Sequence, residues 1–160
     1  MYGYTSYVIK PGDTLYSIAI KFSSTVNRIL MANPNIKPNS LKVGTSIIVP
    51  FSSVVQTNIS YTYDILKMNI SSFSVLYPFL EIGSIGNSVM GKDIPYIRIG
   101  TGRKEVFYSS AIHANEWITS PVIMKFIENL ALAYVGDGYI YRISCKKYIK
   151  LCFYLYCSYG

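Results

Sequence analysis

The stretch YVIKPGDTLYSIAIKF, residues Tyr7–Phe22, decides the fold of the first part of the chain. It begins with aromatic and β-branched residues that favour a short strand, Tyr7–Ile9. Pro11–Asp13 follows as a turn, because Pro fixes φ and Gly tolerates a positive φ. Apolar residues then recur at helical spacing, which predicts an amphipathic helix capped by Asp13 or Thr14.

The residues after this helix predict a second helix and a second strand. Ser23–Thr25 interrupts the apolar period and supplies a new cap. The next apolar stripe, Val26–Leu30, ends before Asn33–Pro34, and a polar loop leads to a strand at Ile47–Val49. The order strand, helix, helix, strand over residues 4–50 predicts an α+β (βααβ) domain. Two strands alone are marginally stable, so we expect both helices to cover one face of the pair.

This first unit resembles a LysM module. The resemblance rests on YVIKPGDTLYSIAIKF, on the turn at Asn33–Asn35 and on LKVGTSIIVP, and it covers all of residues 4–50. It implies that the unit binds peptidoglycan or a chitin-like glycan containing N-acetylglucosamine. The groove of LysM modules lies between the first strand–helix turn and the loop after the second helix, here Gly12, Asp13, Thr14 and Leu15 on one side and Asn33, Pro34, Asn35 and Ile36 on the other. The alternative is a small βααβ domain that uses these residues only to form turns.

A second unit follows a linker. Residues 51–60, FSSVVQTNIS, have no apolar period and predict that linker. A helical stripe begins at Tyr61, and Glu81–Gly86 and Asp93–Gly100 are typical of strands. We expect a hairpin turn after the second of these strands, at Thr101–Lys104. Strands followed by a helix indicate the start of a mixed α/β sheet.

The last predicted strand of this series, Val106–Ile112, has the composition of a buried strand and delivers the chain to His113. A helix is predicted over Pro121–Leu132. We expect its inner face to carry Val122, Phe126 and Ile127, and its outer face to carry Glu128 and Asn129.

His113 is the single histidine, and Glu116 follows it three residues later. An imidazole nitrogen and a carboxylate oxygen are both zinc ligands, and residues three apart on a turn can reach one ion. The strand that precedes them ends where α/β proteins place ligands. An H-x-x-E pattern alone is a weak signal, and the alternative is a surface His and Glu that share a hydrogen bond.

The surrounding sequence resembles the opening part of a zinc carboxypeptidase of the carboxypeptidase A type. The resemblance rests on IGSIGNSVMGKDIPYIRIGTG, VFYSSAIHANEWITSP and the helix through FIENL, and it assigns residues 61–141 to this domain. It implies that His113 and Glu116 are two of three protein ligands of zinc. Asn115 stands where the animal digestive enzymes have Arg. A LysM module followed by such a domain is similar to bacterial γ-D-glutamyl-diamino-acid endopeptidases, which implies a peptidoglycan stem peptide as the substrate.

The same resemblance implies parts that these residues do not supply. The family has a second histidine ligand, an Asn-Arg pair and a catalytic glutamate further downstream, whereas this chain has one histidine. Residues 142–160, RISCKKYIKLCFYLYCSYG, lack a recognisable period and any acid, and we expect an out-of-frame ending or a genuine short variant. We therefore expect an incomplete zinc site and a truncated, inactive peptidase. The alternative function is a non-catalytic LysM module that binds glycan.

Composition excludes several other classes of protein. The chain has 160 residues, of which 51% are apolar and 14% charged, a composition that does not favour intrinsic disorder. Residues 1–50 carry five Lys/Arg and one Asp/Glu, and residues 51–141 carry six Lys/Arg and seven Asp/Glu. Residues 142–160 carry four Lys/Arg and no Asp/Glu. This scattered charge does not favour nucleic acid as a partner.

Membrane, secretion and redox signals are also weak. No apolar run approaches the roughly 18 residues of a membrane span, and the start of the chain lacks the pattern of a signal peptide. Its localisation stays open, with a cell-wall or spore association expected from the LysM resemblance. The three cysteines all fall between Cys145 and Cys157, which excludes a disulfide framework for the preceding residues.

Overall fold

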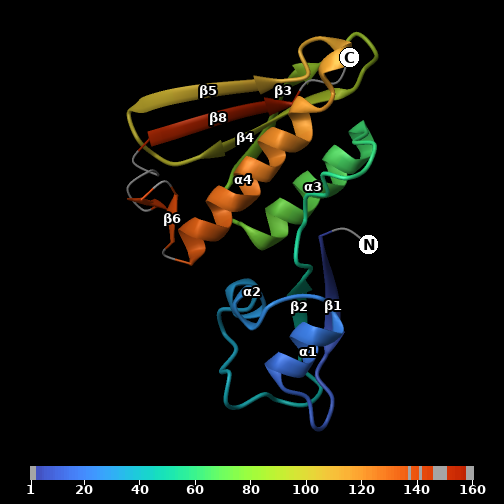
Figure 1. Ribbon diagram of the computed structural model, residues 1–160, viewed down its shortest axis with the longest axis vertical. Coiled ribbons are helices and arrows are strands. Elements are labelled where there is room, and N and C mark those ends of the chain that lie inside the picture. The colour runs from blue at the N-terminus through green and yellow to red at the C-terminus, as the bar shows by residue number, and fades with distance from the viewer. Residues whose placement is uncertain (1–2, 137, 141, 146–150, 158–160) are drawn as a thin grey trace. The chain divides into compact units, whose positions relative to one another are not determined.

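The computed structural model describes residues 3–136, 138–140, 142–145 and 151–157 (Figure 1). The chain divides into two compact units, Met1–Val54 and Val55–Gly160. Within the described residues, no helix combines the length and the apolar character needed to cross a membrane.

The first unit has the predicted order of elements. Strand β1 (Tyr4–Val8) is followed by helices α1 (Leu15–Lys21) and α2 (Val26–Ala32) and by strand β2 (Ser46–Pro50). The two strands are antiparallel, with Tyr4 opposite Pro50 and Val8 opposite Ser46. The α+β fold predicted for this unit is confirmed.

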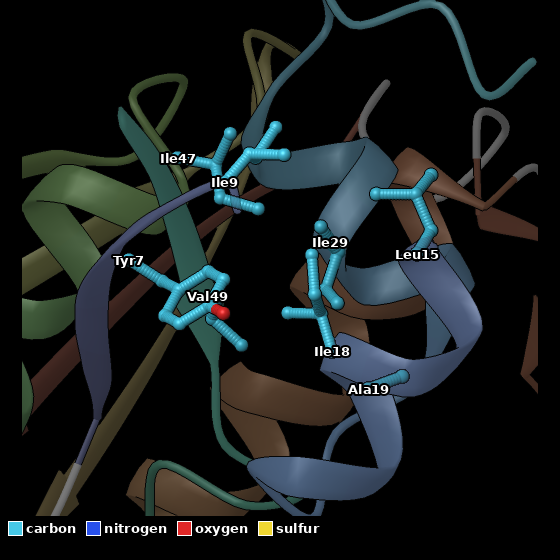
Figure 2. Close-up of a cluster of buried hydrophobic side chains, with 8 residues drawn as sticks. All are labelled: Tyr7, Ile9, Leu15, Ile18, Ala19, Ile29, Ile47 and Val49. Atoms are coloured by element: carbon cyan, nitrogen blue, oxygen red, sulfur yellow. The ribbon is translucent and has the colours of Figure 1, made fainter. Parts of the chain in front are cut away.

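Both helices of the first unit pack their apolar stripes on one face of the strand pair, as Figure 2 shows. Ile18, Ile29 and Val49 have no exposed surface. The full set of buried core residues is Tyr7, Ile9, Leu15, Ile18, Ala19, Ile29, Ile47 and Val49. This core joins all four elements, so the stripes seen in the sequence are the residues that hold the unit together.

Hydroxyl caps fix where the two short helices begin. Thr14 caps α1, because its side chain accepts a hydrogen bond from the Ser17 N–H and the Ser17 side chain accepts one from the Thr14 N–H, both at 3.0 Å. Thr25 caps α2 in the same way through the N–H of Arg28 at 3.2 Å. Each such cap satisfies a donor that the first turn of a helix otherwise leaves free.

The second unit contains α3 before a sheet and α4 after most of its strands. The described elements are α3 (Tyr63–Leu76), β3 (Glu81–Asn87), β4 (Asp93–Ile99), β5 (Lys104–Ser110), the 3-10 helix η1 (Ala114–Glu116), α4 (Thr119–Val135), β6 (Tyr139–Ile140), β7 (Ile143–Ser144) and β8 (Leu151–Cys157). In Figure 1, α3 and α4 lie on the same side of the larger sheet.

The four-stranded sheet is mixed, as predicted, but its strand order differs from the expected hairpin. The order is β3-β4-β8-β5, with β8 antiparallel to β4 and parallel to β5 (Figure 1). The prediction of a hairpin turn at Thr101–Lys104 is therefore wrong. Strand β8 forms hydrogen-bonded pairs with both β4 and β5, so Thr101–Arg103 connects two strands that are not neighbours. This inner strand, β8, comes from residues 142–160, in which the sequence has no recognisable apolar period.

Strand β5 is not the buried strand that its composition suggested. The strand ends at Ser110, and its side chains are mostly exposed, including Phe107 at 59% and Tyr108 at 45%. The reason is its place at one edge of the sheet formed by the described strands, where β8 pairs with it on one side and α4 packs against it. The Tyr108 and Phe126 rings lie 6.2 Å apart, which marks this contact.

Helix α4 is rotated relative to the prediction. Val122 is 63% exposed and Phe126 36%, whereas Glu128 is fully buried; Ile127 faces inward and Asn129 outward, as expected. The buried stripe follows the helical period through Ser120, Met124, Ile127, Glu128 and Ala131. The prediction gave priority to residue type, but the 3.6-residue period places position 128 inside and positions 122 and 126 outside.

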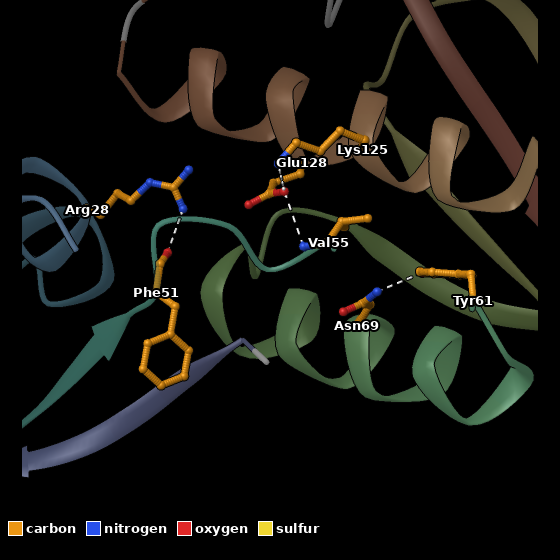
Figure 3. A network of polar contacts seen from close by, with 7 residues as sticks. All are labelled: Arg28, Phe51, Val55, Tyr61, Asn69, Lys125 and Glu128. Atoms are coloured by element: carbon orange, nitrogen blue, oxygen red, sulfur yellow. Dashed lines mark hydrogen bonds and ion pairs between the residues drawn. The ribbon is translucent and has the colours of Figure 1, made fainter. Parts of the chain in front are cut away.

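The Oε2 atom of the buried Glu128 carboxylate has polar partners on its own helix and in a distant segment (Figure 3). The Lys125 ammonium lies 2.7 Å from it, and the Val55 N–H donates to it at 3.3 Å. A buried charge needs such partners, because its desolvation is otherwise costly. Residues 51–60 contain no helix or strand, as expected for a linker. Val54 and Val55 are nevertheless almost fully buried, so part of this segment is packed against the protein and is not exposed to solvent.

Candidate glycan-binding and metal-binding sites

The first predicted side of the glycan groove is a turn organised by Asp13. Its carboxylate accepts hydrogen bonds from the Tyr7 hydroxyl at 2.8 Å and from the Lys10 N–H at 2.7 Å. Gly12 has φ +84°, a conformation that favours glycine. Gly12 and Thr14 are exposed, whereas Leu15 is buried in the core. This turn therefore offers exposed backbone and a hydroxyl to a ligand.

The second predicted side is organised by Asn33. Its side-chain amide donates to the carbonyls of Ile29 at 2.7 Å and Ile48 at 2.6 Å, and its carbonyl oxygen accepts from the Ile48 N–H at 2.9 Å. Asn33 thus fastens the end of α2 to β2. The next residues, Pro34 and Asn35, are exposed, and Ile36 is partly buried.

A cavity of about 310 Å³ lies beside this second loop. Asn35 and Ile36 line it, while residues 12–15 do not, so the structure gathers part of the predicted set. Its complete lining is Ile9, Asn35, Ile36, Lys37, Ser40, Leu41, Lys42 and Thr45. The Thr45 carbonyl accepts from the Ile9 N–H at 2.9 Å and the Ile9 carbonyl accepts from the Gly44 N–H at 2.8 Å, which fixes the loop against the end of β1.

Sequence reasoning missed the lining residues from Lys37 to Thr45. They lie in a polar loop with no period, and nothing local indicated that this loop folds back on Ile9. Alternating Ser40, Leu41 and Lys42 was the available signal, since one apolar residue among polar ones in a loop often marks a contact.

The predicted metal pair lies just beyond the end of β5. His113 Nδ1 and Glu116 Oε1 are 2.9 Å apart, and the two side chains are 73% and 45% exposed. The hydrogen bond from His113 holds the pKa of the Glu116 carboxyl below its usual range, against a smaller opposing effect of burial. The structure therefore brings together the two residues that the H-x-x-E pattern singled out, with the carboxylate in its ionised form.

The donor types of the pair fit zinc, because an imidazole nitrogen and a carboxylate oxygen are both zinc ligands. Their 2.9 Å separation is that of a direct hydrogen bond, which is also the arrangement of the alternative, a surface His and Glu that share a hydrogen bond. Over the ranges that the structure describes, no group of three or more His, Cys, Asp or Glu side chains forms a metal site. The pair thus supplies one imidazole and one carboxylate.

Comparison with known families matches both units. The LysM domain family matches residues 7–50, and the zinc carboxypeptidase family matches residues 67–153. The second match covers more than half of the chain. The chain belongs to the zinc carboxypeptidase family. Its peptidase domain follows a LysM domain, as the sequence indicated, and the family match continues past residue 141 into β8.

Individual relatives match the chain over different shares of its length. Gamma-D-glutamyl-L-diamino acid endopeptidase 1 of Lysinibacillus sphaericus is 40% identical over an alignment 190 positions long, which covers 86% of this chain and 48% of that protein. The chain thus spans about half the length of this relative. The cortical fragment-lytic enzyme of Bacillus subtilis is 44% identical over 46 residues, 29% of this chain and 11% of that protein. The putative L,D-transpeptidase YkuD of Bacillus licheniformis is 46% identical over 44 residues, 28% of this chain and 27% of that protein.

The Asp13 contacts make the stability of the LysM unit depend on pH. The Lys10 N–H and the Tyr7 hydroxyl lower the pKa of Asp13, with smaller contributions from the charges of Lys21 and Lys10. A lowered folded-state pKa gives stability that is present above the unfolded value of about 3.9 and is lost as pH falls through the folded value. The hydrogen bond to Asp13 raises the pKa of Tyr7, so its contribution is present below about pH 10 and is lost as pH rises through the raised value.

We therefore expect Asp13→Asn to reduce the loss of LysM stability below about pH 4. The measurement is urea unfolding of the LysM unit at several pH values, together with an NMR titration of the Asp13 carboxyl. All variants are measured in the full chain, and Asp64→Asn, which removes an exposed carboxylate of α3 in the second unit, is the control and should leave the pH dependence of LysM unfolding unchanged. A titration midpoint for Asp13 at or above 3.9 would contradict the role of these hydrogen bonds.

Proposed function

We propose that this protein acts on peptidoglycan, with its LysM unit binding the glycan and its peptidase domain contributing His113 and Glu116 to a zinc centre directed at stem peptides. The observation that carries the proposal is the 2.9 Å approach of these two side chains in a zinc carboxypeptidase domain that follows a LysM domain. The name of the Lysinibacillus relative, an endopeptidase for a γ-D-glutamyl-L-diamino acid bond, supports the substrate class. The same relationships support a cell-wall association.

His113 and Glu116 are the residues that would hold the zinc ion. When bound in this family, zinc supplies a Lewis acid that polarises the scissile carbonyl and activates water. Glu116, whose carboxyl pKa is lowered by its hydrogen bond with His113, would offer a carboxylate oxygen, and His113 would offer a ring nitrogen that carries no proton. Both side chains are exposed, so a substrate and the ion reach them from solvent.

These 160 residues supply two of the three protein ligands that a catalytic zinc site uses. We therefore propose that the chain by itself binds zinc weakly and does not hydrolyse stem peptides. Glycan binding is then the function that this chain performs alone. A βααβ unit with its own buried core supports this second function, because every residue that lines the cavity belongs to residues 4–50.

The glycan would occupy the cavity beside Asn35 and Ile36 and extend toward the turn at Gly12–Thr14. Amide and hydroxyl groups on Asn35 and Ser40 can bond N-acetyl groups, and Ile9 and Ile36 offer apolar contact. Asp13, Asn33 and Leu15 hold the walls, while Pro34 stiffens the loop. Holding the glycan raises the local concentration of its attached stem peptides at the peptidase domain.

The glycan site predicts a difference between two asparagines of one loop. Asn35 lines the cavity and Asn39, also exposed, does not. Asn35→Ala should weaken binding to N-acetylglucosamine oligomers about fivefold, the equivalent of one hydrogen bond of about 1 kcal/mol. Asn39→Ala is the matched control. Calorimetric titration and co-sedimentation with insoluble peptidoglycan measure both, and equal affinities for the two variants and the wild type would refute the assignment.

The metal site predicts weak binding of one zinc ion that requires both ligands. Either His113→Ala or Glu116→Gln should abolish it in calorimetric titration. Glu105→Gln, which changes an exposed carboxylate on β5, should leave it unchanged. Tight zinc binding or stem-peptide hydrolysis by this chain, lost in His113→Ala, would show that the site is complete and the proposal of inactivity wrong.

A further inference from the structure

The loop between β5 and α4 carries the metal pair, and side-chain packing does not hold it. Ile112 is 65% exposed, Trp117 42% and Ile118 51%. Large apolar side chains in this state contribute little burial energy to the loop. The 2.9 Å approach of His113 and Glu116 must therefore depend on another kind of contact.

The backbone enters this loop in an unfavourable conformation. Ala111 has φ +51°, in the left-handed region that a residue with a Cβ adopts at a steric cost. Such a conformation persists only where surrounding contacts impose it. Ala111 is itself 4% exposed, so these contacts lie within the protein.

The Thr119 hydroxyl makes contacts at both ends of the loop. Its Oγ1 accepts a hydrogen bond from the Ala111 N–H at 2.8 Å and donates one to the Glu116 carbonyl at 2.8 Å. One side chain at the start of α4 thus bonds the residue that makes the turn and the backbone of a metal ligand. The Glu116 N–H in turn donates to the His113 carbonyl at 2.9 Å, which connects the second ligand to the same chain of bonds.

A second pair of hydroxyls supports the first. Ser110 Oγ and Ser120 Oγ lie 3.3 Å apart, and these residues are 3% and 0% exposed. Ser110 and Ala111 therefore face Ser120 and Thr119 as two consecutive rungs between the end of β5 and the start of α4. The buried rung joins the two elements, and the outer rung, made by Thr119, reaches into the loop.

We propose that Thr119 is a positioning residue for the metal pair: its hydroxyl holds the left-handed turn at Ala111 and the Glu116 backbone so that His113 and Glu116 face one cation. The inference rests on the proposed metal-binding function. Thr suits this role because a β-branched side chain has few χ1 rotamers, so its hydroxyl is held toward both partners. Groups that orient metal ligands in this way affect metal affinity about 10- to 100-fold.

The test compares Thr119→Val, which keeps the shape and removes the hydroxyl, with Thr119→Ser, which keeps the hydroxyl. In the full chain, Thr119→Val should speed hydrogen exchange of the Ala111 and Glu116 amides at least about tenfold and weaken zinc binding about tenfold. Thr119→Ser should restore most of both. Exchange in the LysM unit should not change, and amides in the middle of α4 report whether the second unit stays folded.

A double variant separates positioning from general stability. Glycine adopts the left-handed conformation without steric cost. In Ala111→Gly, the turn at residue 111 therefore depends less on the hydrogen bond to the Thr119 hydroxyl. The exchange and zinc defects of Thr119→Val should be smaller in the Ala111→Gly background than in the wild-type background. The proposal would be overturned if Thr119→Val caused equal defects in both backgrounds or behaved like the wild type. It would also be overturned if Thr119→Val and Thr119→Ser caused equal defects. If the wild-type chain binds no zinc at all, the metal site fails as a function, and the amide exchange of Ala111 decides the positioning role by itself.

Discussion

The left-handed turn at Ala111 is the constraint on which the candidate metal centre depends. In an extended strand, residues three apart point to opposite faces, so a continued β5 would direct His113 and Glu116 away from each other. The strand instead ends at Ser110, and the chain enters a 3-10 turn in which the two side chains come within 2.9 Å. The Thr119 hydroxyl bonds both sides of this change of direction. The chemistry of the pair therefore follows from backbone geometry held by a neighbouring helix.

The LysM unit uses the same principle with different residues. The side chains of Asp13 and Asn33 form hydrogen bonds with backbone groups and with a tyrosine hydroxyl. These bonds hold the turn at Asp13 and the loop beside the cavity. Both are residues that the family resemblance placed in the glycan groove. Their contacts hold the turn and the loop, while Asn35, their exposed neighbour, lines the cavity. In both units, the residues that fix the backbone are therefore different from the exposed residues beside them.

Local signals made much of this structure predictable. The caps at Thr14 and Thr25, the apolar stripes and the turn residues are all short-range features, and the βααβ unit follows from them. The H-x-x-E pair was also found from local spacing. Long-range pairing was not predictable: β4 ends at Ile99 and β8 begins only at Leu151, yet β8 pairs with β4 on one side and β5 on the other. The burial of Glu128 was missed because the prediction followed residue type instead of the helical period, and one of its partners, the Val55 N–H, comes from a segment 73 residues away.

X-ray absorption at the zinc edge tests most directly the claim that His113 and Glu116 share one ion. The account predicts for the zinc-loaded chain one imidazole and otherwise oxygen ligands at about 2.0–2.2 Å, with the imidazole scattering lost in His113→Ala. Sulfur scattering at about 2.3 Å would place the ion on cysteine instead. A spectrum that is the same in the wild type and in His113→Ala would also contradict the account, because the ion would then be held without the pair that the turn at Ala111 brings together.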